Sequence, residues 1–238
     1  SKWQSQVKWN ANYLENHDQP RSVSRYGDDK ENRVVSGKML ATLLLTLRGT
    51  PFVFQGQEIG MTNGDFETLD QMQDVESHNV FALATKTLHF PKKVAWKMVL
   101  KTSRDNARTP MQWNSQITGK PWLQVNANYT NINVEKELSN SNSILSYYKE
   151  LIKIRQNNAT LLEGSFFRIP SSKELFIYER ALEDQRCIIV LNFTNKIVTL
   201  PENVLRQIKN NTILAHNYPN QKGSIDTLLP YEAFIFSL

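Results

Sequence analysis

Two short polar motifs contain the residues of this chain that are best suited to chemistry. Residues 16–18 read Asn-His-Asp, so an imidazole stands directly beside a carboxylate, and Gln19 follows them. Residues 104–113 read Arg-Asp-Asn-Ala-Arg-Thr-Pro-Met-Gln-Trp and include two guanidinium groups, at Arg104 and Arg108. A guanidinium fork can bind a carboxylate and hydroxyl groups at the same time, which a lysine cannot imitate. The two motifs thus supply the hydrogen-bond acceptors and donors of a polar site.

The sequence gives little indication of a site for a metal ion, a nucleotide or a nucleic acid. The four histidines show no paired ligand spacing, and no glycine-rich phosphate loop is present, so no metal or cofactor is predicted from these residues. The net charge is +5, from 28 Lys and Arg against 23 Asp and Glu, and it is scattered along the chain. A nucleic-acid partner is not expected, because its footprint needs basic residues clustered on one face.

The composition favours a cytoplasmic protein without a membrane span. The single cysteine, Cys187, lies in an apolar run and cannot form an internal disulfide, which favours a reducing compartment. The longest apolar stretch covers residues 39–47, far short of the ~20 residues that cross a bilayer. The first residues resemble neither a signal peptide nor a natural start, so we expect the chain to begin within a longer protein.

The order of predicted elements in the first third of the chain is typical of a parallel sheet with helical crossovers. Residues 10–15 are predicted as a short strand, and apolar residues at helical spacing predict a helix over 33–48, which Gly49 ends. Residues 52–54 predict a second strand, followed by the polar residues 55–58. Strand, polar loop, helix, strand and polar loop in this order are typical of βα units.

The middle of the chain is predicted to hold helices separated by an irregular excursion. A helix is expected over about 74–88, and an amphipathic segment over 94–100 precedes the arginine motif. Residues 114–142 are rich in Asn, Gln, Gly, Pro and Trp and predict irregular structure. Ser143 stands at the N-cap position of a further helix over 144–155.

Beyond residue 164 the pattern changes to short β-type runs with turn residues between them. This spacing predicts a small all-β sandwich over 163–238, with a boundary near 160–165. The predicted strands are 166–169, 175–180, 186–193, 197–200, 212–215 and 233–238.

Three spaced motifs together resemble glycoside hydrolase family 13, most closely its oligo-1,6-glucosidase, dextran glucosidase and α-glucosidase branch. The motifs are residues 16–21, residues 49–61 and residues 104–113, and the resemblance extends in order over essentially the whole chain. A lone Asn-His-Asp would often match by accident, whereas three ordered motifs followed by a β-domain would not.

The resemblance implies an α/β plus all-β fold for this chain. Residues 10–15 would be the seventh strand and residues 52–54 the eighth strand of a (β/α)8 barrel, whose site lies at the C-terminal ends of the strands. Residues 1–162 would then be the C-terminal portion of the catalytic barrel, and residues 163–238 a C-terminal antiparallel β-sandwich domain.

The same resemblance implies that this chain lacks the groups that break the bond. Retaining hydrolysis needs a nucleophile and an acid/base carboxyl group about 5 Å apart. Members of the family carry both upstream of the region seen here, and no Gly-Phe-Arg-x-Asp segment occurs in this sequence. We therefore expect the isolated chain to be inactive and to need the N-terminal remainder of the barrel as its partner. Calcium, where relatives bind it, would also have upstream ligands.

Asp18 and His17 are the leading site residues. Asp18 resembles the family's transition-state stabiliser, whose hydrogen bonds to sugar hydroxyls strengthen as charge develops. His17 resembles the partner that binds a neighbouring hydroxyl. The structural alternatives are a turn cap for Asp18, because Asp before Gln-Pro starts turns readily, and a purely structural histidine for His17.

Four further residues are candidates for substrate binding. Arg104 resembles the arginine that pairs with an upstream aspartate and holds the terminal glucose, and its alternative is a surface salt bridge. Arg108 is expected to brace the loop, with Asp105 as its partner. Gln19 and Glu76 are candidates for the acceptor side, although Glu76 also suits the first turn of a helix.

Two tryptophans near the arginine motif have two possible roles. Trp113 and Trp122 could stack on sugar rings, but an isolated tryptophan is more often a core residue or a loop anchor.

The sequence therefore predicts the C-terminal part of a retaining, exo-acting α-glucosidase that removes terminal α-linked glucose, preferably α-1,6-linked, from short oligosaccharides. Trehalose-6-phosphate hydrolases and sucrose isomerases or transglucosidases share the motifs and stay open as alternatives. A catalytically dead relative acting as a binding or transporter-associated module is the non-enzymatic alternative.

Overall fold

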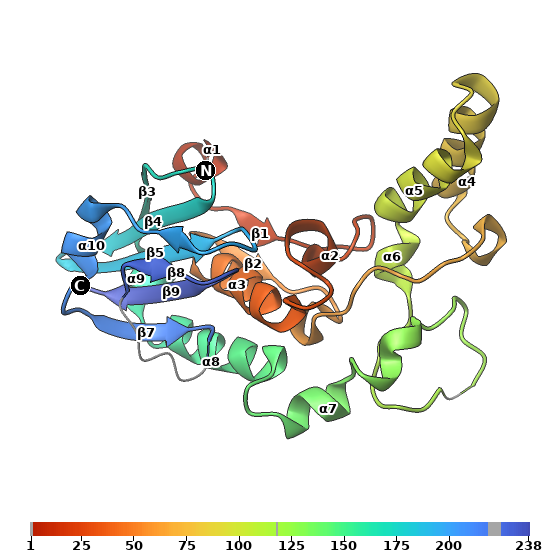
Figure 1. Ribbon diagram of the computed structural model, residues 1–238. Coiled ribbons are helices and arrows are strands. Elements are labelled where there is room, and N and C mark those ends of the chain that lie inside the picture. The colour runs from red at the N-terminus through yellow and green to blue at the C-terminus, as the bar shows by residue number, and fades with distance from the viewer. Residues whose placement is uncertain (1, 118, 219–224) are drawn as a thin grey trace.

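A five-stranded antiparallel sheet forms the C-terminal end of the computed structural model, which describes residues 2–117, 119–218 and 225–238 (Figure 1). Its strand order is β3-β4-β5-β9-β7, and a separate two-stranded sheet pairs β6 with β8. The strands are β3 (Ser165–Ile169), β4 (Leu175–Leu182), β5 (Gln185–Asn192), β6 (Val198–Thr199), β7 (Thr212–His216), β8 (Thr227–Leu228) and β9 (Ala233–Ser237).

Alternate residues of the long strands enter two different cores, as the period of two in a strand requires. Ile188 and Phe236 pack on the face that carries helix α10 (Glu202–Ile208) and the β6–β8 pair. Tyr178 and Ile189 pack on the opposite face, against the helices of the first part of the chain. The expectation of an all-β unit was therefore wrong at residues 202–208, where Pro201 precedes a short helix.

A pair of short parallel strands lies beside this helical layer. Strand β1 (Ala11–Tyr13) pairs in parallel with β2 (Thr50–Phe52), and the predicted helix is present between them as α3 (Arg33–Thr46). Gly49 enters β2 at φ 127°, and a Cβ there would lie 2.3 Å from the Asn10 carbonyl oxygen. Only glycine allows this close approach.

Helix α8 (Ile144–Gln156) packs beside α3 and shares its core. The Ser143 hydroxyl accepts the backbone N–H of Ser146 at 3.1 Å, which confirms the predicted N-cap. Met39, Leu40 and Ile144 are fully buried between the two helices and the sheet. This core therefore joins residues on both sides of the boundary predicted near 160–165.

The C-terminal end of α3 is held by two arginines from different parts of the chain. Arg155 of α8 donates to the carbonyl oxygens of Leu45 at 2.6 Å and Gly49 at 2.7 Å. Arg180 of β4 donates to the carbonyl of Thr46 at 2.6 Å, and burial lowers its pKa to about 10. Cations at a helix C-terminus satisfy carbonyls that have no partner within the helix.

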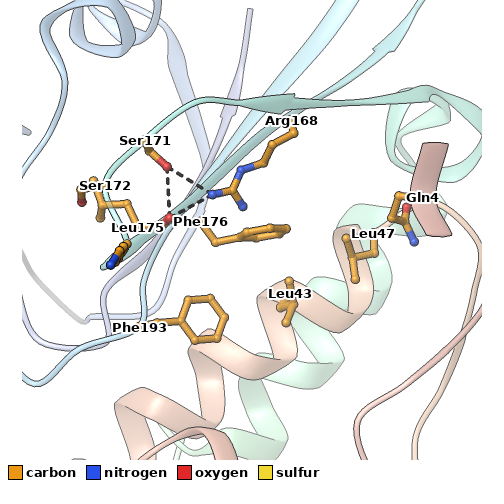
Figure 2. A pocket seen from close by; sticks show the side chains of 10 residues that line it. Gln4, Leu43, Leu47, Arg168, Ser171, Ser172, Leu175, Phe176 and Phe193 are labelled. Carbon is orange, nitrogen blue, oxygen red and sulfur yellow. Dashed lines mark hydrogen bonds between the residues drawn. The ribbon is translucent and has the colours of Figure 1, made fainter. Parts of the chain in front are cut away.

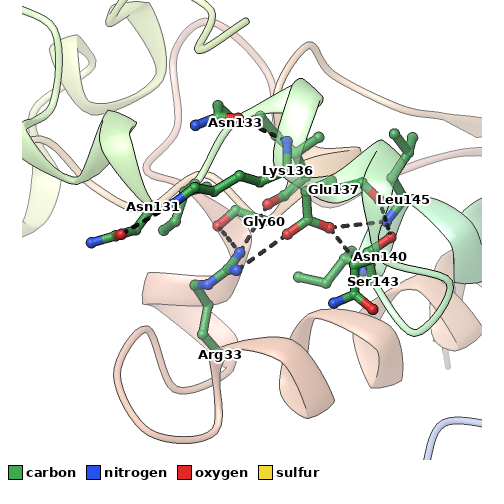
Figure 3. A network of polar contacts seen from close by, with 12 residues as sticks. Arg33, Gly60, Asn131, Asn133, Lys136, Glu137, Asn140, Ser143 and Leu145 are labelled. Carbon is green, nitrogen blue, oxygen red and sulfur yellow. Dashed lines mark hydrogen bonds and ion pairs between the residues drawn. The ribbon is translucent and has the colours of Figure 1, made fainter. Parts of the chain in front are cut away.

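A polar network joins the other end of α3 to the start of α8 (Figure 3). Arg33 donates to the carbonyls of Ile59 and Gly60 and pairs with Glu137 at 3.3 Å. The second carboxylate oxygen of Glu137 accepts the backbone N–H of Ile144 at 2.9 Å. Glu137 lies in α7 (Val134–Ser139), a helix that the expectation of irregular structure over 114–142 missed.

A helical arm extends away from the sheet and carries the arginine motif at its base (Figure 1). It consists of α4 (Val75–Ala82), the π-helical turn η3 (Leu83–Thr87), α5 (Lys92–Thr102) and α6 (Asp105–Arg108). Phe66, Met72, Val99 and Leu123 form its small core. The remaining elements are α1 (Lys2–Gln6), α2 (Ser22–Tyr26), η1 (Gln57–Ile59), η2 (Leu69–Gln71), η4 (Ala127–Thr130) and α9 (Ala159–Glu163).

The described residues contain no helix with the length and apolar character that crossing a membrane requires.

Candidate functional site

The Asn-His-Asp motif forms a turn shortly after β1. The backbone N–H of Asp18 donates to the Asn16 side chain at 2.9 Å, and the Gln19 N–H donates to the Asn16 carbonyl at 3.2 Å. Asn16, rather than Asp18, is therefore the residue whose side chain stabilises the turn. This leaves the Asp18 carboxylate free for side-chain partners.

Asp18 lies in a cluster with His17 and both arginines of the second motif. Arg108 Nη2 is 2.8 Å from Asp18 Oδ1, and His17 Nε2 is 3.2 Å from Asp18 Oδ2. Arg104 Nη1 is 3.9 Å from Asp18 Oδ1. The side chain of Asp18 is 49% exposed, so a ligand can reach the carboxylate without displacing any buried group.

Arg108 does not pair with Asp105 as the sequence suggested. Arg108 donates through Nε to the carbonyl of His17 at 2.9 Å as well as to Asp18. Asp105 is fully buried and accepts the backbone N–H groups of Gln73 at 2.6 Å and Asp74 at 2.8 Å. The prediction was wrong because closeness in sequence favoured Asp105, whereas the fold turns it inward.

Arg104 has a carboxylate partner within this chain. Its Nε and Nη2 donate to Asp74 Oδ1 at 2.9 and 2.5 Å, and its Nη2 is 3.7 Å from Glu76 Oε2. The resemblance implies an upstream aspartate as the partner of Arg104 but does not single out Asp74. Nothing in the sequence marked Asp74 beyond its place before a helix, where it forms the N-cap of α4.

The contacts of Asp74 explain its electrostatics. Burial by itself would raise the pKa of this carboxyl group, but the hydrogen bonds from Arg104 and from Glu76 and Ser77 lower the pKa below its ordinary value. The pKa of Arg104 is raised mainly by its side-chain hydrogen bonds to Asp74. The orientation of Arg104 toward Asp18 is therefore fixed by a carboxylate that stays ionised.

Gln19 and Glu76 lie at the edges of two hollows that both include Asp18. Gln19 accepts from Arg25 Nη1 at 3.1 Å and lines a cavity of about 420 Å³ together with Arg25 and Lys101. Glu76 is 66% exposed and lines a second cavity of about 290 Å³ together with Arg104 and Asp74. The structure thus brings all six predicted site residues to one region.

Trp113 and Trp122 lie outside this cluster. Their side chains are 65% and 63% exposed, so the interpretation of either as a core residue was wrong. Both line a separate cavity, in the loop between α6 and α7.

A buried ion pair between Glu15 and Arg21 supports the segments that carry the cluster. Arg21 is 3.3 Å from Glu15, and both side chains are almost completely inaccessible. Arg21 also donates to the carbonyls of Gln55 at 2.6 Å, Asn106 at 3.2 Å and Ala107 at 3.2 Å. Sequence reasoning missed this pair, because an arginine after Gln-Pro carries no signal of burial.

A larger cavity, of about 730 Å³, lies elsewhere, between α3 and the sheet (Figure 2). Leu43, Leu47 and Phe193 line it, and the Arg168 guanidinium lies over the Phe176 ring at 4.1 Å. Its lining contains no carboxylate or histidine. Across the described part of the chain, no group of three His, Cys, Asp or Glu side chains is placed to hold a metal ion.

Comparison with known proteins identifies the class. Residues 1–164 match the family model described as "Alpha amylase, catalytic domain". The chain therefore belongs to the alpha-amylase family, glycoside hydrolase family 13.

Within this family the similar proteins are glucosidases and related enzymes. The chain is 41% identical to an oligo-1,6-glucosidase of Bacillus cereus, over 100% of this chain and 45% of that protein. It is 37% identical to a trehalose-6-phosphate hydrolase of Bacillus subtilis, over the same shares. The chain thus spans less than half the length of the curated relatives it matches.

Solved structures agree with the sequence relatives. The structure of isomaltulose synthase from Klebsiella sp. LX3 aligns with a TM-score of 0.91 at 34% identity, covering 99% of this chain and 44% of that one. The trehalose-6-phosphate hydrolase of Bacillus licheniformis aligns with a TM-score of 0.90 at 35% identity, with the same coverage.

Proposed function

We propose that this chain is the C-terminal part of a retaining, exo-acting α-glucosidase that removes terminal, preferably α-1,6-linked, glucose from short oligosaccharides. The observation that carries the proposal is the half-exposed Asp18 carboxylate, held by Arg108 and flanked by His17 and Arg104. Relatives named for 1,6-linked substrates, including a glucan 1,6-alpha-glucosidase of Streptococcus pneumoniae, support the linkage.

In this proposal β1 and β2 are the last two strands of a (β/α)8 barrel, and residues 163–238 are the C-terminal β-domain. The nucleophile and the acid/base belong to the N-terminal remainder of the barrel, so the chain alone is inactive. The parallel pairing of β1 with β2 and the position of Asp18 just after β1 support this assignment, because barrel sites lie at the C-terminal ends of strands. The location is cytoplasmic, which the single, buried Cys187 supports.

The Asp18 cluster suits the charge that develops during glycoside cleavage. As the sugar approaches an oxocarbenium ion, its hydroxyls become better hydrogen-bond donors, and Asp18 accepts from them more strongly than in the ground state. His17 binds a neighbouring hydroxyl and helps to hold the ring. Arg108 holds the Asp18 carboxylate in place through its hydrogen bond, and Arg104 faces the same sugar from its anchor on Asp74.

The test uses the longer protein that contains this chain. Asp18→Asn is compared with the parent on p-nitrophenyl α-glucoside, and we expect kcat to fall roughly 10²–10³-fold with little change in stability, as for loss of a transition-state hydrogen-bond partner. Asp184→Asn, in the exposed turn between β4 and β5, is the matched control and should leave kcat unchanged. A near-parental kcat for Asp18→Asn contradicts the role assigned to it.

A second candidate function is hydrolysis of a phosphorylated disaccharide. Arg25 and Lys101 line the cavity beside Asp18 and Gln19, and neither forms an ion pair within the described ranges, so both charges are available to an anionic sugar. Trehalose 6-phosphate and isomaltose compared at equal concentration distinguish the two functions. A higher kcat/KM for trehalose 6-phosphate, lost in Arg25→Gln with Lys101→Gln, favours the second.

A further inference from the structure

Two large aromatic side chains face one cavity that the Asp18 cluster does not use. Trp113 and Trp122 are among the most exposed apolar residues described, at 65% and 63%. Together with Tyr129, Gln116 and Lys120 they line a cavity of about 410 Å³. The lining residues belong to the segment between α6 and α7, two helices that Figure 1 labels. This volume lies within the usual range of small-molecule sites, and the cavity shares no lining residue with the two that contain Asp18.

The backbone that carries Trp113 is fixed. The carbonyl of Trp113 accepts the N–H of Glu135 at 3.0 Å, and the carbonyl of Gln112 accepts the N–H of Val134 at 3.0 Å. The Gln112 side chain donates to the carbonyl of Ile132 at 2.6 Å. Trp113 is thus anchored through its main chain to the start of α7, while its indole stays in solvent.

Trp122 is anchored in a different way. Its neighbour Leu123 is 3% exposed and packs in the small core of the helical arm. Shortly after it, the Asn126 side chain donates to the carbonyl of Asn63 at 2.7 Å. The main chain that carries both indoles is therefore anchored while the rings stay exposed, so little ordering of the backbone is needed when a ligand binds.

The chemistry of the cavity matches a sugar ring. The face of an indole carries negative charge density, which attracts the weakly positive C–H edges on one side of a pyranose. The amides of Asn114 and Gln116 and the ammonium of Lys120 lie in the same lining and can bind hydroxyls. Lys120 disfavours a cationic ligand in the same place, because like charges repel.

We propose that this cavity is a second carbohydrate-binding site, in which Trp113 and Trp122 stack on glucose units of an α-linked oligosaccharide. The site goes beyond the proposed function, because it requires neither Asp18 nor the bond-breaking carboxylates. It would hold a longer chain to the protein while the terminal glucose is elsewhere.

Ligand-observed NMR on this chain tests the proposal directly, with isomaltotriose as the probe. We expect saturation transfer to the sugar C–H protons in the parent and in Asp18→Asn. We expect at least tenfold weaker binding in Trp113→Ala and in Trp122→Ala. Trp113→Phe keeps an aromatic face and should recover part of the affinity. Trp9→Phe removes an exposed tryptophan outside the cavity and serves as the matched control.

Three results would overturn the proposal. The first is loss of the signal in Asp18→Asn with retention in the tryptophan variants, because the sugar would then bind only at the Asp18 cluster. The second is the absence of binding in the parent. The third is preferential binding of adenosine over isomaltotriose, which would assign the aromatic faces to a planar ring. Failure of the α-glucosidase proposal would appear in kcat and would leave these binding measurements unchanged.

Discussion

Two arginine–carboxylate pairs have carboxylates that are close in the sequence, Glu15 and Asp18, but the two pairs have opposite environments. Glu15 and Arg21 are at most 1% exposed, whereas Asp18 and Arg108 are 49% and 26% exposed. The chemistry of the two pairs is the same. The buried pair has all its partners inside the protein, and the open pair leaves acceptor positions for a ligand. Access of water, rather than residue type, therefore separates the supporting pair from the binding pair.

The buried pair also positions the open one. Arg21 donates to Gln55 after β2 and to Asn106 and Ala107 in α6, so one guanidinium ties three segments together. Arg104 and Arg108 flank the two α6 carbonyls that Arg21 holds. The distance between Asp18 and Arg108 is thus set by a side chain that no ligand can touch.

Replacement of Arg21 should have the largest effect. Arg21→Met leaves Glu15 buried without its cation and removes the donor to three carbonyls. We expect the free energy of unfolding to fall by about 3–5 kcal/mol, measured by urea denaturation. Arg25→Met, which removes a neighbouring exposed cation stacked on Tyr26, is the control. A loss below about 1 kcal/mol for Arg21→Met would mean that water reaches the pair.

Asp74→Asn should have an intermediate effect that depends on pH. Because the folded pKa of Asp74 is lowered, its contribution is fully present above the ordinary carboxyl pKa of about 4 and is lost as the pH falls through the folded value. We expect a loss of about 1–3 kcal/mol at pH 7 that shrinks toward pH 2. Unfolding curves at several pH values measure it. Equal losses at pH 7 and pH 2 contradict this account.

Arg108→Lys should change stability little and binding much. The pair with Asp18 is open to water, so we expect a change in the free energy of unfolding of less than about 1 kcal/mol. In the longer protein, KM for isomaltose should rise at least tenfold, since lysine lacks the fork that contacts Asp18 and His17 together. If stability falls as far as in Arg21→Met, the distinction between the two pairs is wrong.

Glu202→Gln should have the smallest effect. Glu202 and Arg206 pair across one turn of α10 and are 77% and 74% exposed. We expect a change of at most about 0.5 kcal/mol, because such pairs gain little in water. Thermal unfolding in low and high salt measures it, and a larger change would show that exposure alone does not rank these pairs.

The long helices and the β-rich region were predictable because their signals are local. Apolar spacing located α3 within two residues at its C-terminal end, and Ser143 marked the start of α8. Helices α7 and α10 were missed because they are short, and no long apolar period marks them. Tertiary contacts with Arg33 and with the sheet hold them in place.

The motifs selected candidate residues that lie together in the structure, but the sequence did not indicate their pairings. Asp18, His17, Arg104 and Arg108 were selected by motif, and they do meet. Which carboxylate faces which arginine depends on how far the chain folds back, and spacing in the sequence says nothing about that. Asp105 was therefore assigned to Arg108 although it binds the backbone before α4, and Asp74 was overlooked.

The shared arginine cap at the end of α3 limits how this protein could be recombined. Arg155 and Arg180 both donate to carbonyls at this helix end, and in the sequence one lies before residue 163 and the other after it. A chimera that takes its β-region from another protein at that junction loses Arg180. The buried carbonyl of Thr46 then loses this hydrogen-bond donor. A functional exchange has to transfer α3, α8 and the sheet as one module.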